Sequence, residues 1–385
     1  MESNQIRGLD LSKIETPAFI VDLEALRENC RLLDALRKQT GVKVLLALKG
    51  FSMFSVFPEI REYLDGVCAS SLNEAILGRE EFGKEVHSYS PAYKKGTLEK
   101  LFELSDHIVF NTPGQWERFA DLRNDYEGKV SCGLRINAEH SETETVIYDP
   151  SAPYSRLGSV RKEIPAGFIK QVDGVHIHNL CEKNFDSLRR TWRHVEKNFR
   201  TELAGLKWIN LGGGHHITKP GYGYSELVQF LNDLKSKYRA QIYLEPGEAV
   251  ALNAGYFVSE VLDIMKNDID IAILDCAVPC HLPDVMEMPY RPQILSADGP
   301  YVKKYTYRLG GTSCLAGDVA GDYSFDRTLS PGDKLIFTDM AHYTMVKTTT
   351  FNGIGLPSIY ACETEDNSLK LIKSFSYNDF KERLS

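Results

Sequence analysis

Lys49 is the residue whose type and position most suggest covalent chemistry. It closes the segment Val42–Lys49 (VKVLLALK), a nearly continuous apolar run of the kind that forms a strand buried on both faces. An amine in a medium of low dielectric has a lowered pKa, and a neutral amine can form an imine with an aldehyde cofactor. The alternative is a packing role, because long lysine side chains also cover apolar surface at strand ends.

Two further segments place candidate ligand-binding groups directly after short apolar runs. Gly212-Gly213-Gly214 follows WINL, and three successive backbone amides without side chains can form a nest for a phosphate group. Glu245 ends the run QIYLE, where a buried carboxylate could bond a pyridinium nitrogen and so maintain an aromatic cofactor as an electron sink. The simpler interpretations are a glycine turn and an ordinary polar strand end.

His176 and His178 share one face of the segment Gly174–Asn179 (GVHIHN), because successive side chains of a strand point to opposite faces. They could bind a metal, as in a hydrolase built on a barrel, or one of them could stack on an aromatic cofactor. No acidic residue stands at an obvious partner spacing, so we expect no metal, although His215 and His216 keep that option open. A pair of satisfied core histidines is the third interpretation.

The eight cysteines include no CxxC pair, so we expect no structural zinc site. The N-terminal segment lacks the apolar core of a secretory signal, and we therefore expect reduced thiols and a cytoplasmic location. Cys314 lies in GGTSCLAGD, where a thiol among Gly, Ser and Thr is a plausible acid. A buried structural cysteine is the more frequent case.

The elements that must position these residues alternate between strand and helix. Apolar runs recur about eight times, separated in many places by helical segments such as Ser71–Phe82 and Phe185–Glu202. This alternation indicates an α/β protein with a parallel barrel or a doubly wound sheet. We favour a (β/α)8 barrel, because the candidate residues stand at the C-terminal ends of different strands. The predicted strands are Val42–Lys49, Gly66–Ala69, Glu85–Tyr89, His107–Phe110, Val130–Asn137, Gly174–Asn179, Trp208–Leu211 and Gln241–Glu245.

Beyond about Gly255 the pattern changes to strands with few convincing helices between them, which predicts a second, mainly antiparallel β domain. The segment Ala18–Asp22 (AFIVD) reads as one more strand that returns to this domain, and Asp22 is available to cap the helix after it. We therefore predict a barrel over residues 23–254 and a β domain from residues 1–22 and 255–385. The later predicted strands are Tyr256–Ile264, Ile269–Asp275, Gln293–Ala297, Lys304–Leu309 and Lys334–Thr338.

Charge and composition narrow the class of partner. The formal net charge is −8 without a basic block, which argues against nucleic acid and against an anionic membrane surface. No apolar stretch approaches the length of about 18 residues that a membrane span needs. We expect a small cationic substrate.

In their order along the chain, these motifs resemble one enzyme family. The series LALK, HIHN, LGGG, LEPG, GTSC and DMAHYTMV is found in the alanine racemase-like group of pyridoxal-phosphate (PLP) enzymes. The chain is similar to the decarboxylases of that group, which act on ornithine, arginine and diaminopimelate. The segments LRIN, YSRLG and TTFNG extend the resemblance over nearly the whole chain. CHLPDVMEMPYRP, ALKGFS and HNLCE resemble the branch that decarboxylates carboxylated polyamines.

That resemblance implies a decarboxylase with PLP as its cofactor. Lys49 would bind the cofactor covalently, His178 would stack on its ring, and Glu245 would pair with the ring nitrogen. The three glycines and the hydroxyl of Tyr343 would hold its phosphate.

The resemblance also implies a head-to-tail homodimer with shared active sites. Cys314 would reach across the dimer interface and protonate the substrate carbon after CO2 leaves. Acidic residues with no evident partner in the sequence would bind the cationic amines of a polyamine substrate. The candidates are Glu248, Asp284, Glu287 and Asp318, of which we expect two or fewer to touch substrate.

The chain departs from the pattern of related decarboxylases at three places. Glu248 replaces an arginine that would touch the phosphate, Leu180-Cys181 replaces a glycine-serine pair, and Leu315 replaces an acidic residue that helps read the distal amine. These changes weaken diaminopimelate or ornithine as substrate, although a diaminopimelate or arginine decarboxylase of the same fold stays an alternative. A non-enzymatic PLP-binding barrel protein is disfavoured, because such proteins lack the β domain.

Overall fold

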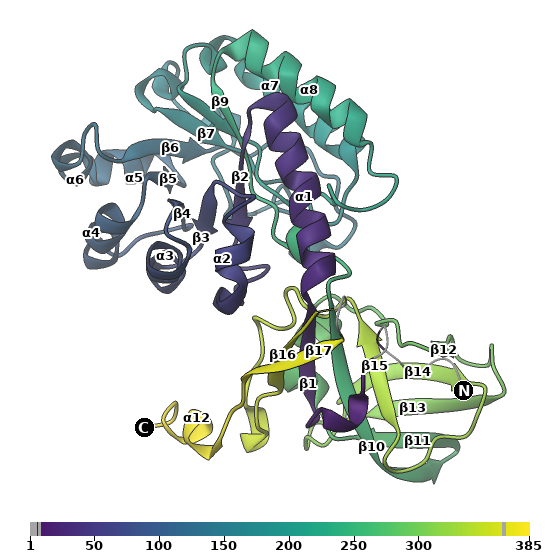
Figure 1. Ribbon diagram of the computed structural model, residues 1–385. Coiled ribbons are helices and arrows are strands. Elements are labelled where there is room, and N and C mark those ends of the chain that lie inside the picture. The colour runs from purple at the N-terminus through teal and green to yellow at the C-terminus, as the bar shows by residue number, and fades with distance from the viewer. Residues whose placement is uncertain (1–5, 7–8, 364–366) are drawn as a thin grey trace. The chain divides into compact units, whose positions relative to one another are not determined.

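The computed structural model describes residue 6 and residues 9–363 and 367–385 (Figure 1). The chain divides into two compact units. One is Glu28–Val250, and the other combines the N-terminal part through Arg27 with Ala251–Ser385.

The first unit is a closed barrel of eight parallel strands, in which the last strand pairs with the first. This confirms the predicted (β/α)8 architecture, since short strands buried on both faces are what the continuous apolar runs indicated. The strands are β2 (Lys43–Ala47), β3 (Gly66–Ala69), β4 (Glu85–Tyr89), β5 (His107–Phe110), β6 (Ser131–Arg135), β7 (Gly174–His176), β8 (Trp208–Asn210) and β9 (Gln241–Leu244).

Helices join the strands of this unit. Asp22 caps α1 as predicted, because its Oδ1 accepts a hydrogen bond from the backbone N–H of Ala25 at 3.1 Å. The longest later helices, α7 and α8, pack against each other (Figure 1). The helices are α1 (Leu23–Thr40), α2 (Phe57–Ile60), α3 (Leu72–Leu77), α4 (Lys95–Leu104), α5 (Pro113–Arg118), α6 (Ala120–Asp125), α7 (Phe185–Leu203), α8 (Tyr224–Tyr238) and α9 (Glu248–Ala251).

Side chains that point inward fill the barrel. Trp208 is the largest of them, and β6 and β7 carry glycine where its ring lies. A Cβ atom at Gly133 would come within 2.3 Å of the Trp208 ring, and one at Gly174 within 2.0 Å. The barrel interior is therefore a packed core, and chemistry has to take place at an end of it.

The second unit is a sheet whose strand pairs are mostly antiparallel, as predicted. The N-terminal strand β1 lies between β10 and β16, antiparallel to the former and parallel to the latter. The strands are β1 (Ala18–Asp22), β10 (Gly255–Asn267), β11 (Ile269–Leu274), β12 (Ala297–Asp298), β13 (Tyr305–Gly310), β14 (Val319–Phe325), β15 (Lys334–Thr338), β16 (Ser358–Glu363) and β17 (Ser368–Lys373). Its helices are α10 (Val278–His281), α11 (Pro283–Glu287) and α12 (Tyr377–Lys381).

The strand predicted over Gln293–Ala297 is wrong for most of its length. Only Ala297 begins a strand, and Ile294 makes an isolated bridge to Phe337. Three strands were not predicted, namely β14, β16 and β17. Within the described ranges, no helix is long and apolar enough to cross a membrane.

Candidate functional site

The predicted covalent lysine, the histidine strand, the glycine turn and the strand-end glutamate meet at the C-terminal ends of the barrel strands. The Nζ atom of Lys49, after β2, lies 3.4 Å from Nε2 of His178, after β7. Nδ1 of the same ring lies 3.2 Å from the backbone nitrogen of Gly213, after β8. Three segments that are far apart in the sequence are thus joined by one imidazole.

The hydrogen bonds of His178 define its tautomer. A backbone N–H can only donate, so Nδ1 accepts from Gly213 and the ring proton is on Nε2, facing Lys49. Burial, reinforced by the charge of Lys49, lowers the pKa of His178 to about 3. The ring is therefore neutral at physiological pH, and its Nε2–H can donate to Lys49 only when Lys49 is a neutral amine.

The environment of Lys49 favours that neutral amine. Solvent reaches part of the Lys49 side chain, but the protein atoms around it displace water that would hydrate the ammonium ion. This desolvation lowers the pKa of Lys49. The nearby Arg135 acts in the same direction, whereas Cys68 and Glu245 oppose it. A lysine in these surroundings is a better nucleophile at neutral pH than a lysine in water.

Glu245 is buried and held through both carboxylate oxygens. Asn210 donates from Nδ2 to Oε1 at 2.7 Å, and Nε2 of His176 lies 3.0 Å from Oε2. Burial alone would raise the pKa of Glu245, but the neighbouring His176 outweighs it and holds the pKa well below its usual value. The site therefore contains a fixed carboxylate anion.

The turn after β8 requires glycine, because other backbone segments approach it too closely for a side chain. A Cβ atom at Gly213 would lie 2.0 Å from the carbonyl oxygen of Glu245, and one at Gly214 would lie 1.7 Å from that of Leu180. The amide of Gly212 donates to Oδ1 of Asn210 at 2.8 Å, and that of Gly213 donates to His178. Two of the three amides that we expected to be bare thus have partners within the protein.

Four residues of this site were not predicted from the sequence. Arg135 donates from Nη2 to the carbonyl oxygen of His178 at 2.8 Å and lies over the ring of Tyr89. Asn210 binds Glu245, while Cys68 and Glu74 are electrostatically coupled to Lys49. Successive side chains of a strand point to opposite faces, and Arg135 and Asn210 stand at positions that point into the barrel. This alternation was the signal that could have found both residues.

The remaining predicted residues, except Glu248, lie in the second unit. Cys314 is exposed, and its backbone N–H donates to Oδ1 of Asn352 at 2.9 Å. Tyr343 is half-buried and adopts a positive φ of 43°. Cys314 is thus not the buried structural cysteine that was the alternative interpretation.

The expectation that the four acidic candidates are unpaired is wrong. Glu248, in the barrel unit, lies 3.1 Å from Nε2 of His216. Asp284 and Glu287 both accept hydrogen bonds from Nζ of Lys347, at 2.5 and 2.7 Å.

Asp318 is buried and accepts from the backbone N–H groups of Val278 and Ser313, at 2.7 and 2.8 Å. A carboxylate that accepts two backbone hydrogen bonds supports the local fold.

Two groups of side chains in the barrel have the composition of a metal site. In each, the donor atoms lie within 4.8 Å of one another. One group is His176, His178 and Glu245, and the other is Glu85, His87 and His107.

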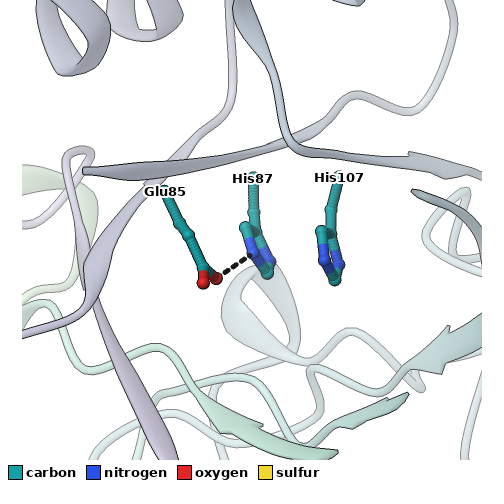
Figure 2. A group of neighbouring side chains, drawn as sticks. All are labelled: Glu85, His87 and His107. Atoms are coloured by element: carbon teal, nitrogen blue, oxygen red, sulfur yellow. Dashed lines mark hydrogen bonds and ion pairs between the residues drawn. The ribbon is translucent and has the colours of Figure 1, made fainter. Parts of the chain in front are cut away.

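The second group lies on β4 and β5 (Figure 2). Glu85 and His107 are the first residues of these strands, whereas Lys49 follows the C-terminal end of β2. The rings of His87 and His107 stack at 3.9 Å with an interplanar angle of 12°, so their ring nitrogens do not converge on one point. Lys43 and the hydroxyl of Tyr243 already bind the Glu85 carboxylate. This geometry does not favour a metal.

Comparisons with known proteins agree with the geometry at the strand ends. The model of the family described as "Pyridoxal-dependent decarboxylase, C-terminal sheet domain" matches residues 19–341. A carboxynorspermidine/carboxyspermidine decarboxylase of Campylobacter jejuni is 41% identical over 96% of this chain and 99% of its own length. A carboxyaminopropylagmatine decarboxylase of Synechocystis is 41% identical over 99% of this chain and 98% of its own length.

Solved structures give the same relationship. The crystal structure of carboxynorspermidine decarboxylase from Campylobacter jejuni, complexed with norspermidine, superposes with a TM-score of 0.89 at 41% identity. It covers 96% of this chain and 100% of that chain. The diaminopimelate decarboxylase of Helicobacter pylori superposes with a TM-score of 0.82 at 16% identity, over 97% of this chain and 98% of that one. The latter similarity concerns the fold alone.

Proposed function

Because this chain belongs to the pyridoxal-dependent decarboxylase family, and is therefore a PLP enzyme, we propose that it decarboxylates carboxynorspermidine or carboxyspermidine. The products would be norspermidine and spermidine, in polyamine biosynthesis. The observation that carries this proposal is the near full-length match, at 41% identity, to the Campylobacter jejuni enzyme of that specificity.

A second candidate substrate is carboxyaminopropylagmatine. The Synechocystis relative that acts on it is also 41% identical, over 98% of its own length. That molecule would differ from the first two in carrying a guanidinium group. Diaminopimelate is less favoured, since the diaminopimelate decarboxylase of Helicobacter pylori shares only 16% identity.

The residues around Lys49 fit PLP. Lys49 would attack the aldehyde carbon, and its lowered pKa keeps part of the amine neutral. His178 would stack on the ring, in an orientation that the N–H of Gly213 fixes at Nδ1. PLP, when bound, supplies an electron sink for the pair that departing CO2 leaves on the substrate carbon.

Glu245 would pair with the pyridine nitrogen. Its pKa is held well below the usual value, so it is an anion throughout the neutral range. An anion at that position favours a protonated nitrogen, and the proton makes the ring the stronger electron acceptor.

The glycine turn and the hydroxyl of Tyr343 would hold the phosphate. The amides of Gly212 and Gly213 already donate to protein acceptors, so we assign direct phosphate binding to the N–H of Gly214. The other two glycines would act by keeping the turn narrow.

We further propose a cytoplasmic homodimer with shared active sites. Cys314 would come from the partner subunit and protonate the substrate carbon, which its exposure on this subunit supports. All eight cysteines are free thiols, which fits a reducing compartment.

The cationic amines of the substrate would bind acidic side chains. Asp284 and Glu287 are the better candidates of the second unit, because a substrate ammonium can replace the ammonium of Lys347 that they now share. Glu248 stays a candidate beside His216. Asp318 is the weakest, since its carboxylate is occupied by backbone N–H groups.

A substrate panel tests the proposal. The purified holoenzyme is given carboxynorspermidine, carboxyspermidine, carboxyaminopropylagmatine, meso-diaminopimelate and L-arginine in separate assays, and CO2 release is measured as kcat/KM. Lys49→Ala serves as the inactive control. We expect the first two acids to exceed the others by at least about tenfold, a difference of 1.36 kcal/mol in the transition state. A preference for diaminopimelate or arginine would contradict the proposal. A preference for carboxyaminopropylagmatine would establish the second candidate.

A further inference from the structure

His176 is a buried histidine of the site to which the proposed function gives no role. It lies at the end of β7 and is 3% exposed. Its Nε2 lies 3.0 Å from Oε2 of Glu245, and its ring packs against Tyr89 at 5.5 Å between centroids. Its other nitrogen, Nδ1, is buried and has no hydrogen-bond partner among the described residues.

These contacts define the protonation of His176. A carboxylate anion only accepts hydrogen bonds, so Nε2 carries a proton and donates it to Glu245. A proton on Nδ1 as well would place an unsatisfied N–H and a positive charge in the interior, near Arg135 and Lys49. His176 is therefore a neutral donor with its lone pair on Nδ1.

Asn210 completes the support of the carboxylate from the other side. Its Nδ2 donates to Oε1 of Glu245, and its own Oδ1 is fixed by the amide of Gly212. Two donors from neighbouring strands, one on each oxygen, leave the Glu245 carboxylate little freedom to rotate. They also stabilise its ionised form over its protonated form.

We propose that His176 is a positioning residue, whose Nε2–H keeps Glu245 ionised and turns its carboxylate toward the pyridine nitrogen of the cofactor. The inference rests on the proposed role of Glu245. The two histidines of the HIHN strand then have separate tasks: His178 contacts the ring face, and His176 acts only through Glu245. Loss of His176 reduces kcat by roughly 10- to 100-fold, as expected for one charge-assisted hydrogen bond, and leaves KM within about a factor of three.

The test compares variants of the holoenzyme that differ at one hydrogen bond. His176→Leu removes the donor, and His176→Gln retains an amide N–H of similar reach. His87→Leu is the matched control, because His87 is also a buried strand histidine of the barrel with Nε2 facing a carboxylate, at 3.3 Å from Glu85 (Figure 2). If His176→Leu does not fold, His176→Asn takes its place. The amide of asparagine is one methylene shorter than that of glutamine, so it should not reach the Glu245 carboxylate.

The readout is the protonation of the cofactor nitrogen, measured by 15N NMR after reconstitution with 15N-labelled PLP, together with kcat and KM. We expect the pyridinium signal at neutral pH in the wild type, His176→Gln and His87→Leu. In His176→Leu, or in His176→Asn, we expect the signal to move toward that of the free base and kcat to fall. An unchanged nitrogen signal with kcat equal to that of His87→Leu would overturn the inference.

Glu245→Gln separates this inference from the proposed function. If Glu245→Gln keeps the pyridinium signal, the proposed role of Glu245 is itself wrong. If Glu245→Gln loses the signal while the His176 variants keep it, Glu245 acts as proposed and only the positioning role of His176 is refuted.

Discussion

Replacing Glu245 with glutamine removes one negative charge with little change in shape. The carboxamide oxygen can still accept from Nδ2 of Asn210, which now lies 2.7 Å from Oε1. The amide NH2 would then face Nε2 of His176. Because Nδ1 of His176 has no partner among the described residues, its proton can move there and leave Nε2 as an acceptor. We therefore expect the variant to fold and to bind PLP.

The catalytic cost of that substitution is large. Without an adjacent anion, the pyridine nitrogen loses the interaction that favours its protonation, and the electron sink weakens. The loss of one charge-assisted contact in the transition state is worth about 3 kcal/mol, or roughly 100-fold in kcat. The assay measures kcat and KM with carboxynorspermidine on protein whose PLP content is verified by absorbance, and thermal unfolding checks the fold. Activity within a factor of three of the wild type, at full PLP content, would refute this reasoning.

Three further predictions concern the shared site, the lysine and the glycine turn. Mixed under subunit exchange, the inactive Lys49→Ala and Cys314→Ala homodimers should recover about a quarter of wild-type activity, since half the dimers then contain one intact site; no recovery after verified exchange would refute the shared site. As the pH is lowered, the rate at which PLP reacts with the cofactor-free protein should begin to fall only at a pH below that of a free lysine side chain, because the lowered pKa of Lys49 keeps its amine neutral to a lower pH. Stopped-flow absorbance measures this rate, and a fall that begins near pH 10.5 would contradict the prediction. Gly214→Ala should lower the unfolding temperature by several degrees more than Gly205→Ala, because both have a positive φ but only the Cβ at Gly214 would meet backbone, 1.7 Å from the oxygen of Leu180; equal shifts would contradict it.

The barrel strands were predictable because parallel strands covered on both faces form continuous apolar runs. Two of the missed strands of the second unit, β14 and β17, lack that signal. β17 (SLKLIK) is mostly exposed, and β14 (VAGDYSF) contains glycine and aspartate in its middle. The segment Gln293–Ala297 is apolar enough to suggest a strand, yet only Ile294 bridges to another strand before Ala297.

The residues of the site that could be predicted are those that stand at the ends of barrel strands. Lys49 and Glu245 stand where apolar runs stop, and the structure brings Lys49 to His178 and both histidines to Glu245. Alternation along β8 could have shown that Asn210 points inward, but no local pattern shows that its partner is Glu245 on the neighbouring strand.

The acidic residues were misjudged for a related reason. The partner of Asp284 is Lys347, which is 63 positions away along the chain. Pairing over such a separation is fixed by the fold and leaves no local pattern.

The attachment of PLP to Lys49 is the central claim, and borohydride reduction tests it most directly. Reduction of the holoenzyme converts an imine into a stable secondary amine, which proteolysis and mass spectrometry can assign to one peptide. We expect the pyridoxyl mass on Lys49, together with loss of the visible absorbance, and we expect no stable label in Lys49→Ala. A label on another lysine of the wild type, or a normal reducible chromophore in Lys49→Ala, would contradict the account.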